Sequence, residues 1–357
     1  MSKIERIVSF DLLRISAIVA VVFIHASGTM WYDLDPHSFA WQTCNFYDSL
    51  VRWGVPVFVM ISGALFLRDE YEIKIPRLYR KNILRIITAF IFWSLVYSTY
   101  HAIVDQDFSK LNFVERFIKG EYHLWFLFLI VGLYIVTPLI KPLVQHEKIV
   151  KYFLVLAFIF SFLGSSLAVW MRGLISATQN HALTVLYGAI SAVLGDKLLY
   201  TAFGYAAYFV LGHYLTVHTF SKHTRIVLYV LGGLGFLYTV LATSLASMLA
   251  GAGFEGFYNY TQVNVLCESV AVFVFIRQCR WEPSEKAAGF IAEISSLIFG
   301  IYLIHALILA ELNRVIALLP PNYLVFMIPL SAVVTLAIST LVIYPLSKVR
   351  CLKRHIM

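Results

Sequence analysis

The sequence predicts an all-α, polytopic integral membrane protein: a helical bundle of about ten transmembrane helices with both termini in the cytoplasm. Three observations lead to this fold class. Of the 357 residues, 60% are hydrophobic and only 13% are charged, whereas soluble domains are about 25% charged. Several apolar runs reach the roughly 20 residues that cross the hydrocarbon core of a bilayer. The Lys and Arg residues are unequally distributed between the segments that separate these runs. A soluble globular protein is therefore excluded.

Ten apolar stretches are expected to cross the bilayer. The first follows a short polar segment and has no small-residue cleavage site, which predicts a retained span and not a removed signal peptide. The loops between the stretches are too short for a second folded domain, so residues 1–357 are expected to form one membrane domain. The spans lie near 8–28, 51–67, 83–103, 124–144, 151–170, 201–218, 227–249, 262–277, 288–311 and 323–346.

One further apolar segment, 182–194, is too short to cross a bilayer comfortably. Polar residues bound it on both sides, Asn180 and His181 before it and Asp196 and Lys197 after it. We interpret it as an interfacial or re-entrant segment.

The positive charges predict the orientation of the chain. If the N-terminus lies inside, 20 of the 28 Lys and Arg residues fall on the inner side and seven on the outer side, with Arg14 inside the first span. Cytoplasmic loops carry the excess of positive charge, so the sequence indicates a multi-pass protein of the inner (cytoplasmic) membrane. The basic residues are spread over many loops without interleaved stacking aromatics, which argues against nucleic acid as a partner. The four cysteines form no metal-binding or disulfide pattern, so no metal is predicted.

Ionisable residues inside the first span are candidate functional groups, because each costs about 2.5–3.5 kcal/mol to insert. Asp11 and Arg14 are three residues apart and can pair on one helical face. His25 lies eleven residues after Arg14, and about 100° per residue brings both to the same face, roughly 16 Å apart along the axis. The alternative interpretation remains open. In it, Asp11 and Arg14 extend their charged groups to the inner membrane interface, and His25 makes a structural hydrogen bond inside the bundle.

The outer half of the bundle is rich in imidazole and carboxylate groups. Glu268 lies within the span 262–277 and needs a cationic or imidazole partner there, unless it is protonated. His305 lies in the outer third of the span 288–311, His123 opens the span 124–144, and Arg52 opens the span 51–67. A structural pair for Glu268 and structural hydrogen bonds for the two histidines stay open as alternatives.

A cluster of cations precedes the span 83–103 on the inner side, formed by Lys74, Arg77, Arg80, Lys81 and Arg85. Clustered Arg and Lys donors are what phosphate recognition requires. The same cluster is also expected of any inner-side loop, so composition alone does not distinguish the two explanations.

Five motifs follow one another along nearly the whole chain. They are Arg14 with His25; Phe58, Ser62 and Gly63; His123, Trp125, Tyr134 and Pro138; Gly204, Tyr205 and Gly212; and Ser295, Ser296, Gly300, Tyr302 and His305. Together they resemble the acyltransferase-3 family of membrane acyltransferases. Within the family, the chain is most similar to the compact branch that includes the enterobacterial common antigen O-acetyltransferase. The family often has Arg-x-x-Arg at the start of the third span, where this chain has Asn82 and Arg85.

The resemblance implies transfer of an acyl group, usually acetyl, from cytoplasmic acyl-CoA, with acetyl-CoA as the usual co-substrate, to a hydroxyl of an extracytoplasmic or lipid-linked glycan or another envelope acceptor. An imidazole suits such chemistry near neutral pH. We therefore expect His25 to act as general base or as relay to an acyl-enzyme, Glu268 to orient it, and Arg14 to assist. Arg14, Arg80, Lys81 and Arg85 would bind acyl-CoA. The supporting or acceptor-side residues would be Asp11, Ser62, Tyr122, His123, Trp125, Tyr302 and His305.

Two other classes of function remain open from the sequence. Ten spans with buried charges also describe a transporter or flippase for a glycan or lipid-linked sugar. Against it, the two halves show no matching pair of Gly- or Pro-broken spans, the usual sign of inverted repeats. A sensory or anchoring membrane domain is the third interpretation.

Overall fold

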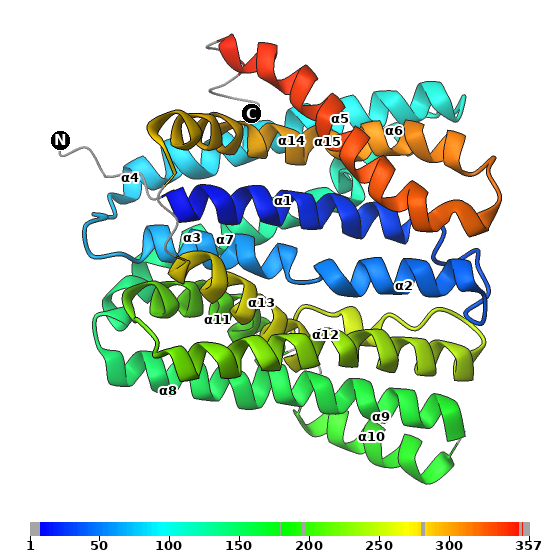
Figure 1. Ribbon diagram of the computed structural model, residues 1–357, viewed down its shortest axis with the longest axis horizontal. Coiled ribbons are helices and arrows are strands. Elements are labelled where there is room, and N and C mark those ends of the chain that lie inside the picture. Colours follow the sequence, from blue (N-terminus) through cyan, green and yellow to red (C-terminus); the bar gives the residue numbers. More distant parts are fainter. Residues whose placement is uncertain (1–7, 179, 195–197, 280–282, 350–351, 353–357) are drawn as a thin grey trace.

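The computed structural model describes residues 8–178, 180–194, 198–279, 283–349 and 352. Within these residues every regular element is a helix, and most helices run along the long axis of the molecule (Figure 1). The N-terminal half contains α1 (Val8–Gly28), α2 (Phe39–Val51), α3 (Gly54–Phe66), α4 (Ile75–Arg77), the π-helix η1 (Leu78–Ile83), α5 (Leu84–Val104), α6 (Lys110–Lys119), the 3-10 helix η2 (Tyr122–Leu124), α7 (Trp125–Val144), α8 (Glu147–Ala157), the π-helix η3 (Phe158–Leu163) and α9 (Gly164–Thr178).

The C-terminal half continues the bundle with further long helices and two short 3-10 turns. It contains α10 (His181–Leu194), α11 (Leu198–Val217), α12 (Lys222–Ala250), η4 (Gly256–Tyr258), α13 (Val263–Gln278), α14 (Glu285–Ile316), η5 (Pro321–Tyr323) and α15 (Leu324–Lys348).

The prediction of an all-α polytopic membrane bundle is confirmed. Among the described residues, nine helical stretches are long and apolar enough to cross a membrane. Each of them contains most or all of one predicted span. The stretches are Val8–Gly28, Phe39–Phe66, Ile75–Val104, Lys110–Val144, Glu147–Ile175, Lys222–Ala250, Gly256–Gln278, Glu285–Ile316 and Pro321–Lys348.

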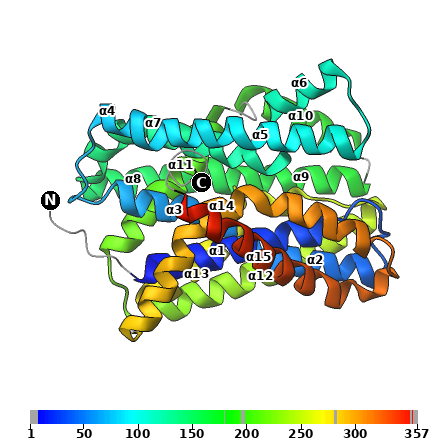
Figure 2. The ribbon, with the colours of Figure 1, turned by 90° about the horizontal axis from the view of Figure 1, so that it is seen from above.

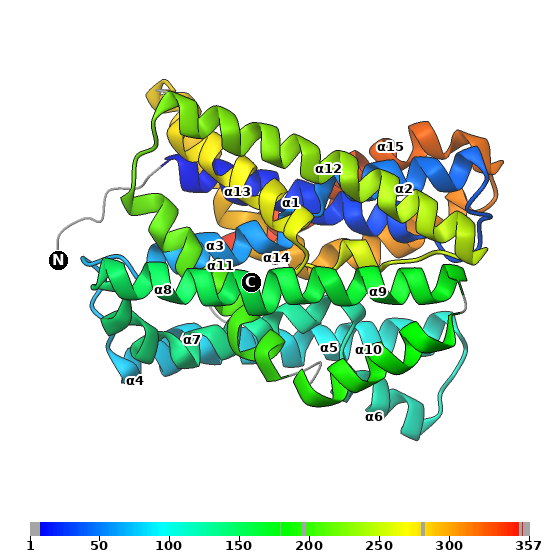
Figure 3. The ribbon, with the colours of Figure 1, turned by 90° about the horizontal axis from the view of Figure 1, so that it is seen from below.

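The remaining predicted span, 201–218, is the sixth of the ten in chain order. It coincides with α11, which is helical but is not one of these nine stretches. The short segment 182–194 forms α10, which packs against α9 (Figure 3). Its interfacial or re-entrant placement stays a prediction.

Helices α1 and α14 form the centre of the bundle. Helix α1 packs against α14, α3, α2, α15 and α13, and 67% of the most apolar part of α14 is buried, against 22% for α12. Figure 2 shows α5 along one face of the molecule and α12 and α13 along the opposite face. Four polar side chains of these two helices are buried inside the protein: Asp11 and Ser27 of α1, and Ser295 and His305 of α14.

The basic end of the bundle is the end where α1, α8, α12 and α14 begin and where α4 lies, at the left of Figure 1. Six of the cations predicted to be cytoplasmic lie in these elements: Arg77, Lys148, Lys151, Lys222, Arg225 and Lys286. We call the opposite end, where α2 and α15 begin, the outer end.

The second predicted span, 51–67, was wrong at its start. The helix begins twelve residues earlier, at Phe39, and is interrupted at Arg52 and Trp53 between α2 and α3. Pro56 explains the interruption, because it has no N–H to donate to the carbonyl of Arg52 one helical turn before it. The break places Arg52 inside the bundle and not at its surface.

Helices α3 and α11 approach each other so closely that only glycine fits at two positions. A Cβ added to Gly63 would lie 1.7 Å from the backbone oxygen of Phe209, and one added to Gly212 would lie 2.0 Å from the oxygen of Met60. Small residues allow such close backbone packing between membrane helices. This contact fixes α3, which lines the inner cavity described below.

Replacing Gly63 by alanine is therefore expected to destabilise the protein by about 1–3 kcal/mol, the usual cost of overpacking. The measurement is the thermal unfolding temperature of the purified protein in detergent. Gly132→Ala on α7 is the matched control, because nothing lies within 4 Å of a Cβ at that position. Equal unfolding temperatures for the two variants would contradict the assigned contact.

Candidate active site

An inner cavity of about 380 Å³ opens between α1, α3, α5, α7 and α14. Three of the four residues predicted to bind acyl-CoA line it: Arg14, Lys81 and Arg85. The other polar groups in its wall are Ser62, Asn82, Tyr134, Ser295, Ser296 and Tyr302. The cavity thus combines cations and hydroxyls with an apolar wall, formed by residues that include Phe58, Phe66, Phe126 and Phe299.

The predicted pair on the first turn of α1 is present and includes a third member. Arg14 donates to Asp11 at 2.9 Å, and Ser295 of α14 donates to the same carboxylate at 2.6 Å. Asp11 is 2% exposed, whereas the side chain of Arg14 is 31% exposed. Asp11 is therefore satisfied within the protein and orients Arg14, whose guanidinium borders the cavity.

The π-helix η1 sets which basic residues reach the inner cavity. Its wide turn places Lys81 and Asn82 in the cavity wall together with Arg85, whereas Arg80 is exposed and does not line the cavity. Arg85 lies 5.2 Å from the ring centroid of Phe299 in a cation–π contact. The wider turn of the π-helix accounts for the position of Arg80 outside the cavity wall. Asn82, at the position of the family's first Arg, lines the cavity itself.

Ser62 also belongs to the inner cavity and not to the acceptor side. Its hydroxyl donates to the carbonyl of Phe58 at 3.0 Å, within the same helix. This geometry agrees with a helix-packing hydroxyl that also presents an oxygen to the cavity.

An outer cavity of about 580 Å³ lies on the other side of the bundle centre and contains His25 in its wall. Tyrosines and carboxylates dominate the polar part of the wall. Glu121 is held by His101 at 2.9 Å. The hydrogen bond from Tyr32 to Glu255 raises the pKa of Tyr32 to about 12, so its hydroxyl stays protonated. The polar lining residues are His25, Thr29, Trp31, Tyr32, Asp48, Arg52, Tyr97, Tyr100, His101, Glu121, Tyr122, Glu255 and Asn313.

Three histidines and Tyr302 form a layer between the two cavities, in which His123, His305 and Tyr302 are buried. The ring centroids of His25 and His305 are 5.3 Å apart in a stacked arrangement, and those of His305 and His123 are 4.9 Å apart. Tyr302 follows at 5.4 Å from His123 and 5.8 Å from His305. Tyr122 contacts the edge of His25 at 5.0 Å. The structure thus brings together His25, His123, His305, Tyr302 and Tyr122.

The ring nitrogens of this layer are only partly satisfied. Nδ1 of His305 contacts the carbonyl oxygen of Tyr302 at 2.6 Å. Its Nε2 is buried with no hydrogen-bond partner among the described residues, and the same holds for both ring nitrogens of His123. Buried polar atoms without partners are rare in proteins, and they mark a position that a ligand or water can complete.

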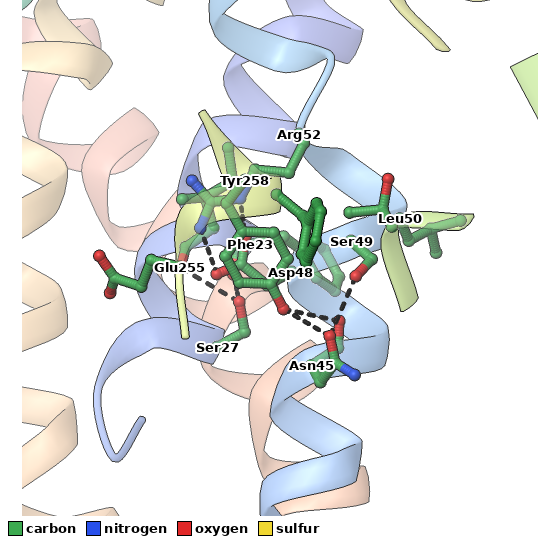
Figure 4. Close-up of polar contacts among 12 residues, drawn as sticks. Phe23, Ser27, Asn45, Asp48, Ser49, Leu50, Arg52, Glu255 and Tyr258 are labelled. Atoms are coloured by element: carbon green, nitrogen blue, oxygen red, sulfur yellow. Dashed lines mark hydrogen bonds and ion pairs between the residues drawn. The ribbon is translucent and has the colours of Figure 1, made fainter. Parts of the chain in front are cut away.

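A buried ion pair between Asp48 and Arg52 forms a second polar group in the outer cavity (Figure 4). Arg52 donates through Nη2 to Asp48 Oδ2 at 2.6 Å, and its Nε lies 2.6 Å from Oδ1. The guanidinium also lies 4.1 Å from the ring centroid of Tyr258. Figure 4 shows the three side chains gathered between the helices, with Asn45 and Ser49 beside them.

Sequence reasoning missed Asp48, because the predicted span began three residues after it. The signal that identifies it is the i, i+4 spacing of Asp48 and Arg52, which becomes visible once the helix is started at Phe39.

Among the described residues, Glu268 and Trp125 line neither cavity and form no ring contact with the three histidines. Glu268 of α13 accepts a hydrogen bond from Thr239 at 2.8 Å, and Asn264 donates to the same threonine at 2.8 Å. Among the described residues no contact joins Glu268 to His25. Trp125 packs against Tyr205 and Tyr260 at centroid distances of 5.9 and 6.2 Å and lines neither cavity.

The comparison with protein families assigns the chain to a family. The family model of acyltransferase-3, described as an acyltransferase domain, matches residues 7–347. The chain belongs to the acyltransferase-3 family. No curated protein and no solved structure matches it. The resemblance in the sequence is confirmed for the family, and the protein is a membrane acyltransferase.

The motifs of this acyltransferase converge on the two cavities. Arg14 and His25 of the first motif lie on α1, one in the wall of each cavity, and Tyr302 and His305 of the last motif lie in the layer between them. Gly63 and Gly212 of two other motifs are the close contact between α3 and α11.

Proposed function

We propose that the protein transfers an acyl group, most simply acetyl, from acyl-CoA in the cytoplasm to a hydroxyl of an extracytoplasmic or lipid-linked glycan in the cytoplasmic membrane of the cell. One observation supports the proposal: Tyr302 lines the cavity with the cations, His25 lines the other cavity, and the rings of both contact His305. A donor and an acceptor can therefore approach His25 from opposite ends of the bundle.

The inner cavity fits the donor. Coenzyme A carries a pyrophosphate and a 3′-phosphate, and Arg14, Lys81 and Arg85 supply charged donors for them. The apolar wall beyond these cations suits the pantetheine arm and the acyl group. Tyr302 lines this cavity and its ring contacts His305, so the thioester must pass Tyr302 to reach an acceptor oxygen beside His25.

His25 is the general base in this proposal. It takes the proton from the acceptor hydroxyl while that oxygen bonds to the thioester carbonyl carbon, the carbon–sulfur bond then breaks, and the leaving CoA thiolate receives the proton. Stacking on His305 and the edge contact with Tyr122 hold the imidazole ring in place. These two rings take the orienting role that the sequence suggested for Glu268.

The outer cavity suits an acceptor rich in hydroxyls. Glu121 and Glu255 offer oxygens that accept hydrogen bonds from sugar hydroxyls, and Tyr97, Tyr100 and Tyr122 add aromatic faces and phenol groups. A glycan fits this combination better than an anionic acceptor, which the carboxylates would repel.

Purified protein in liposomes tests the proposal against the transporter alternative. An acyltransferase consumes acetyl-CoA and releases free CoA when membrane glycan from the same cells is supplied. Movement of glycan without release of CoA would support the carrier and contradict the proposal.

Arg85→Gln is expected to raise the KM for acetyl-CoA by about tenfold, since one charge-assisted hydrogen bond to phosphate contributes about 1.5–3 kcal/mol. Arg80→Gln is the matched control, because Arg80 is exposed one turn earlier and does not line the cavity. Steady-state kinetics of CoA release would measure both. A larger effect for Arg80 than for Arg85 would place the donor elsewhere.

A further inference from the structure

A third cavity, of about 720 Å³, lies at the basic end of the bundle between the start of α12 and the end of α13. Its polar lining is formed by Arg225, Arg277 and Gln278, and its apolar lining by Phe220, Tyr229 and Phe275. It shares no lining residue with the inner or the outer cavity. The proposed acyl transfer therefore leaves this cavity without a role.

The donors of this cavity are incompletely paired. Nε of Arg225, Nε of Arg277 and Nε2 of Gln278 are buried, and none has a hydrogen-bond partner among the described residues. Arg277 donates through Nη1 to Ser9 at 2.6 Å and lies 4.6 Å from the ring centroid of Phe10. Arg225 and Arg277 form no ion pair within the described part of the chain. Two guanidinium groups and an amide thus line one cavity, and no carboxylate of the described residues lines it with them.

We propose that this cavity binds the phosphate group of an anionic phospholipid from the membrane leaflet at the basic end. Basic pockets between transmembrane helices on the cytoplasmic side are suited to anionic lipid headgroups. Arginine can bind two phosphate oxygens at once, and Gln278 supplies a further donor.

The surroundings of the cavity favour a lipid over free phosphate. Phe275 in its wall is 57% exposed, and Val230 and Leu234 farther along α12 are 54% and 56% exposed. In a membrane-spanning bundle, such exposed apolar side chains face the hydrocarbon. A fatty acyl chain of a bound phospholipid would lie along this apolar surface. Free phosphate would contact only the two arginines and Gln278. A choline headgroup is disfavoured, because its own positive charge would lie close to the two arginines.

Native mass spectrometry of the purified full-length protein tests the proposal. The protein is incubated with equimolar phosphatidylglycerol and phosphatidylcholine, and the bound lipids are counted. Wild type is expected to retain phosphatidylglycerol preferentially, and Arg225→Gln/Arg277→Gln to bind it about tenfold more weakly, which corresponds to 1.4 kcal/mol. Arg225→Gln alone is included because Arg277 also contacts Ser9, and it is expected to show part of the loss in a folded protein.

Lys148→Gln/Lys286→Gln is the matched control. It removes two exposed charges from the same end of the bundle, outside the cavity, and is expected to bind phosphatidylglycerol like wild type. Equal retention by wild type and both arginine variants would overturn the proposal. Equal binding of phosphatidylcholine, or displacement of the lipid by millimolar inorganic phosphate, would also overturn it, the last in favour of a soluble anion.

Discussion

His25→Ala is expected to lower the rate of acyl transfer by about 10²–10⁴-fold, the usual contribution of a positioned general base. The side chain lines the outer cavity and stacks on His305, so no other imidazole reaches the same position without rearrangement. The effect should appear in kcat more than in the KM for acetyl-CoA, because the cations of the inner cavity are unchanged. The measurement is the rate of acetyl transfer by purified protein, together with its unfolding temperature.

His213→Ala is the control for this variant. His213 is also buried, at 6% exposure, but it lies on α11 and lines neither the inner nor the outer cavity. Its replacement is expected to leave the rate per folded molecule close to wild type. Wild-type activity in His25→Ala would contradict the assignment of the base.

Arg52→Gln is expected to destabilise the protein by about 3–5 kcal/mol, because it leaves the carboxylate of Asp48 buried without its partner. Asp48 is 2% exposed, and the side chain of Arg52 is 15% exposed. Asp48→Asn/Arg52→Gln removes both charges and is expected to recover a large part of the loss. The free energy of unfolding of the four proteins in the double-mutant cycle gives the coupling directly.

The exposed pair Glu147 and Lys151 on α8 provides the comparison. It has the same i, i+4 spacing and a similar distance of 2.6 Å, but both side chains are more than half exposed. Lys151→Gln should therefore change the stability by less than about 1 kcal/mol. Equal losses for Arg52→Gln and Lys151→Gln would contradict a structural role for the buried pair.

The fold and part of the site could be predicted from the sequence because a bilayer makes the physical constraints severe. Apolar runs long enough to cross the bilayer predict the transmembrane helices. An ionisable group inside such a run is costly to insert, which indicates a functional role. That reasoning identified Asp11, Arg14 and His25 on one helix. It also predicted His305 and His123 in the outer half of the bundle, and the structure places His305 against His25 and His123 against His305.

The partners across helices could not be predicted in the same way. The sequence gives the depth of a side chain along its helix, but not the neighbour that it faces. Glu268 has a suitable depth for His25 and instead faces Thr239. Asp48 was missed because Pro56 interrupts a helix that starts well before the apolar run. The π-helix η1 leaves Arg80 outside the wall of the inner cavity, which the sequence did not indicate. Each failure comes from geometry that only the packed bundle defines.

The central claim is that the acyl group is transferred from a donor at the basic end to an acceptor at the outer end, with His25 as the general base. Inside-out membrane vesicles test it most directly, since their cytoplasmic face is turned outward and their glycan is enclosed. Radiolabelled acetyl-CoA is added outside, and the label on glycan in the lumen is measured for wild type and His25→Ala. The account predicts labelled lumenal glycan in wild type and background label in the variant. Label confined to acceptors on the outer surface of the vesicles, or equal label with and without His25, would contradict it.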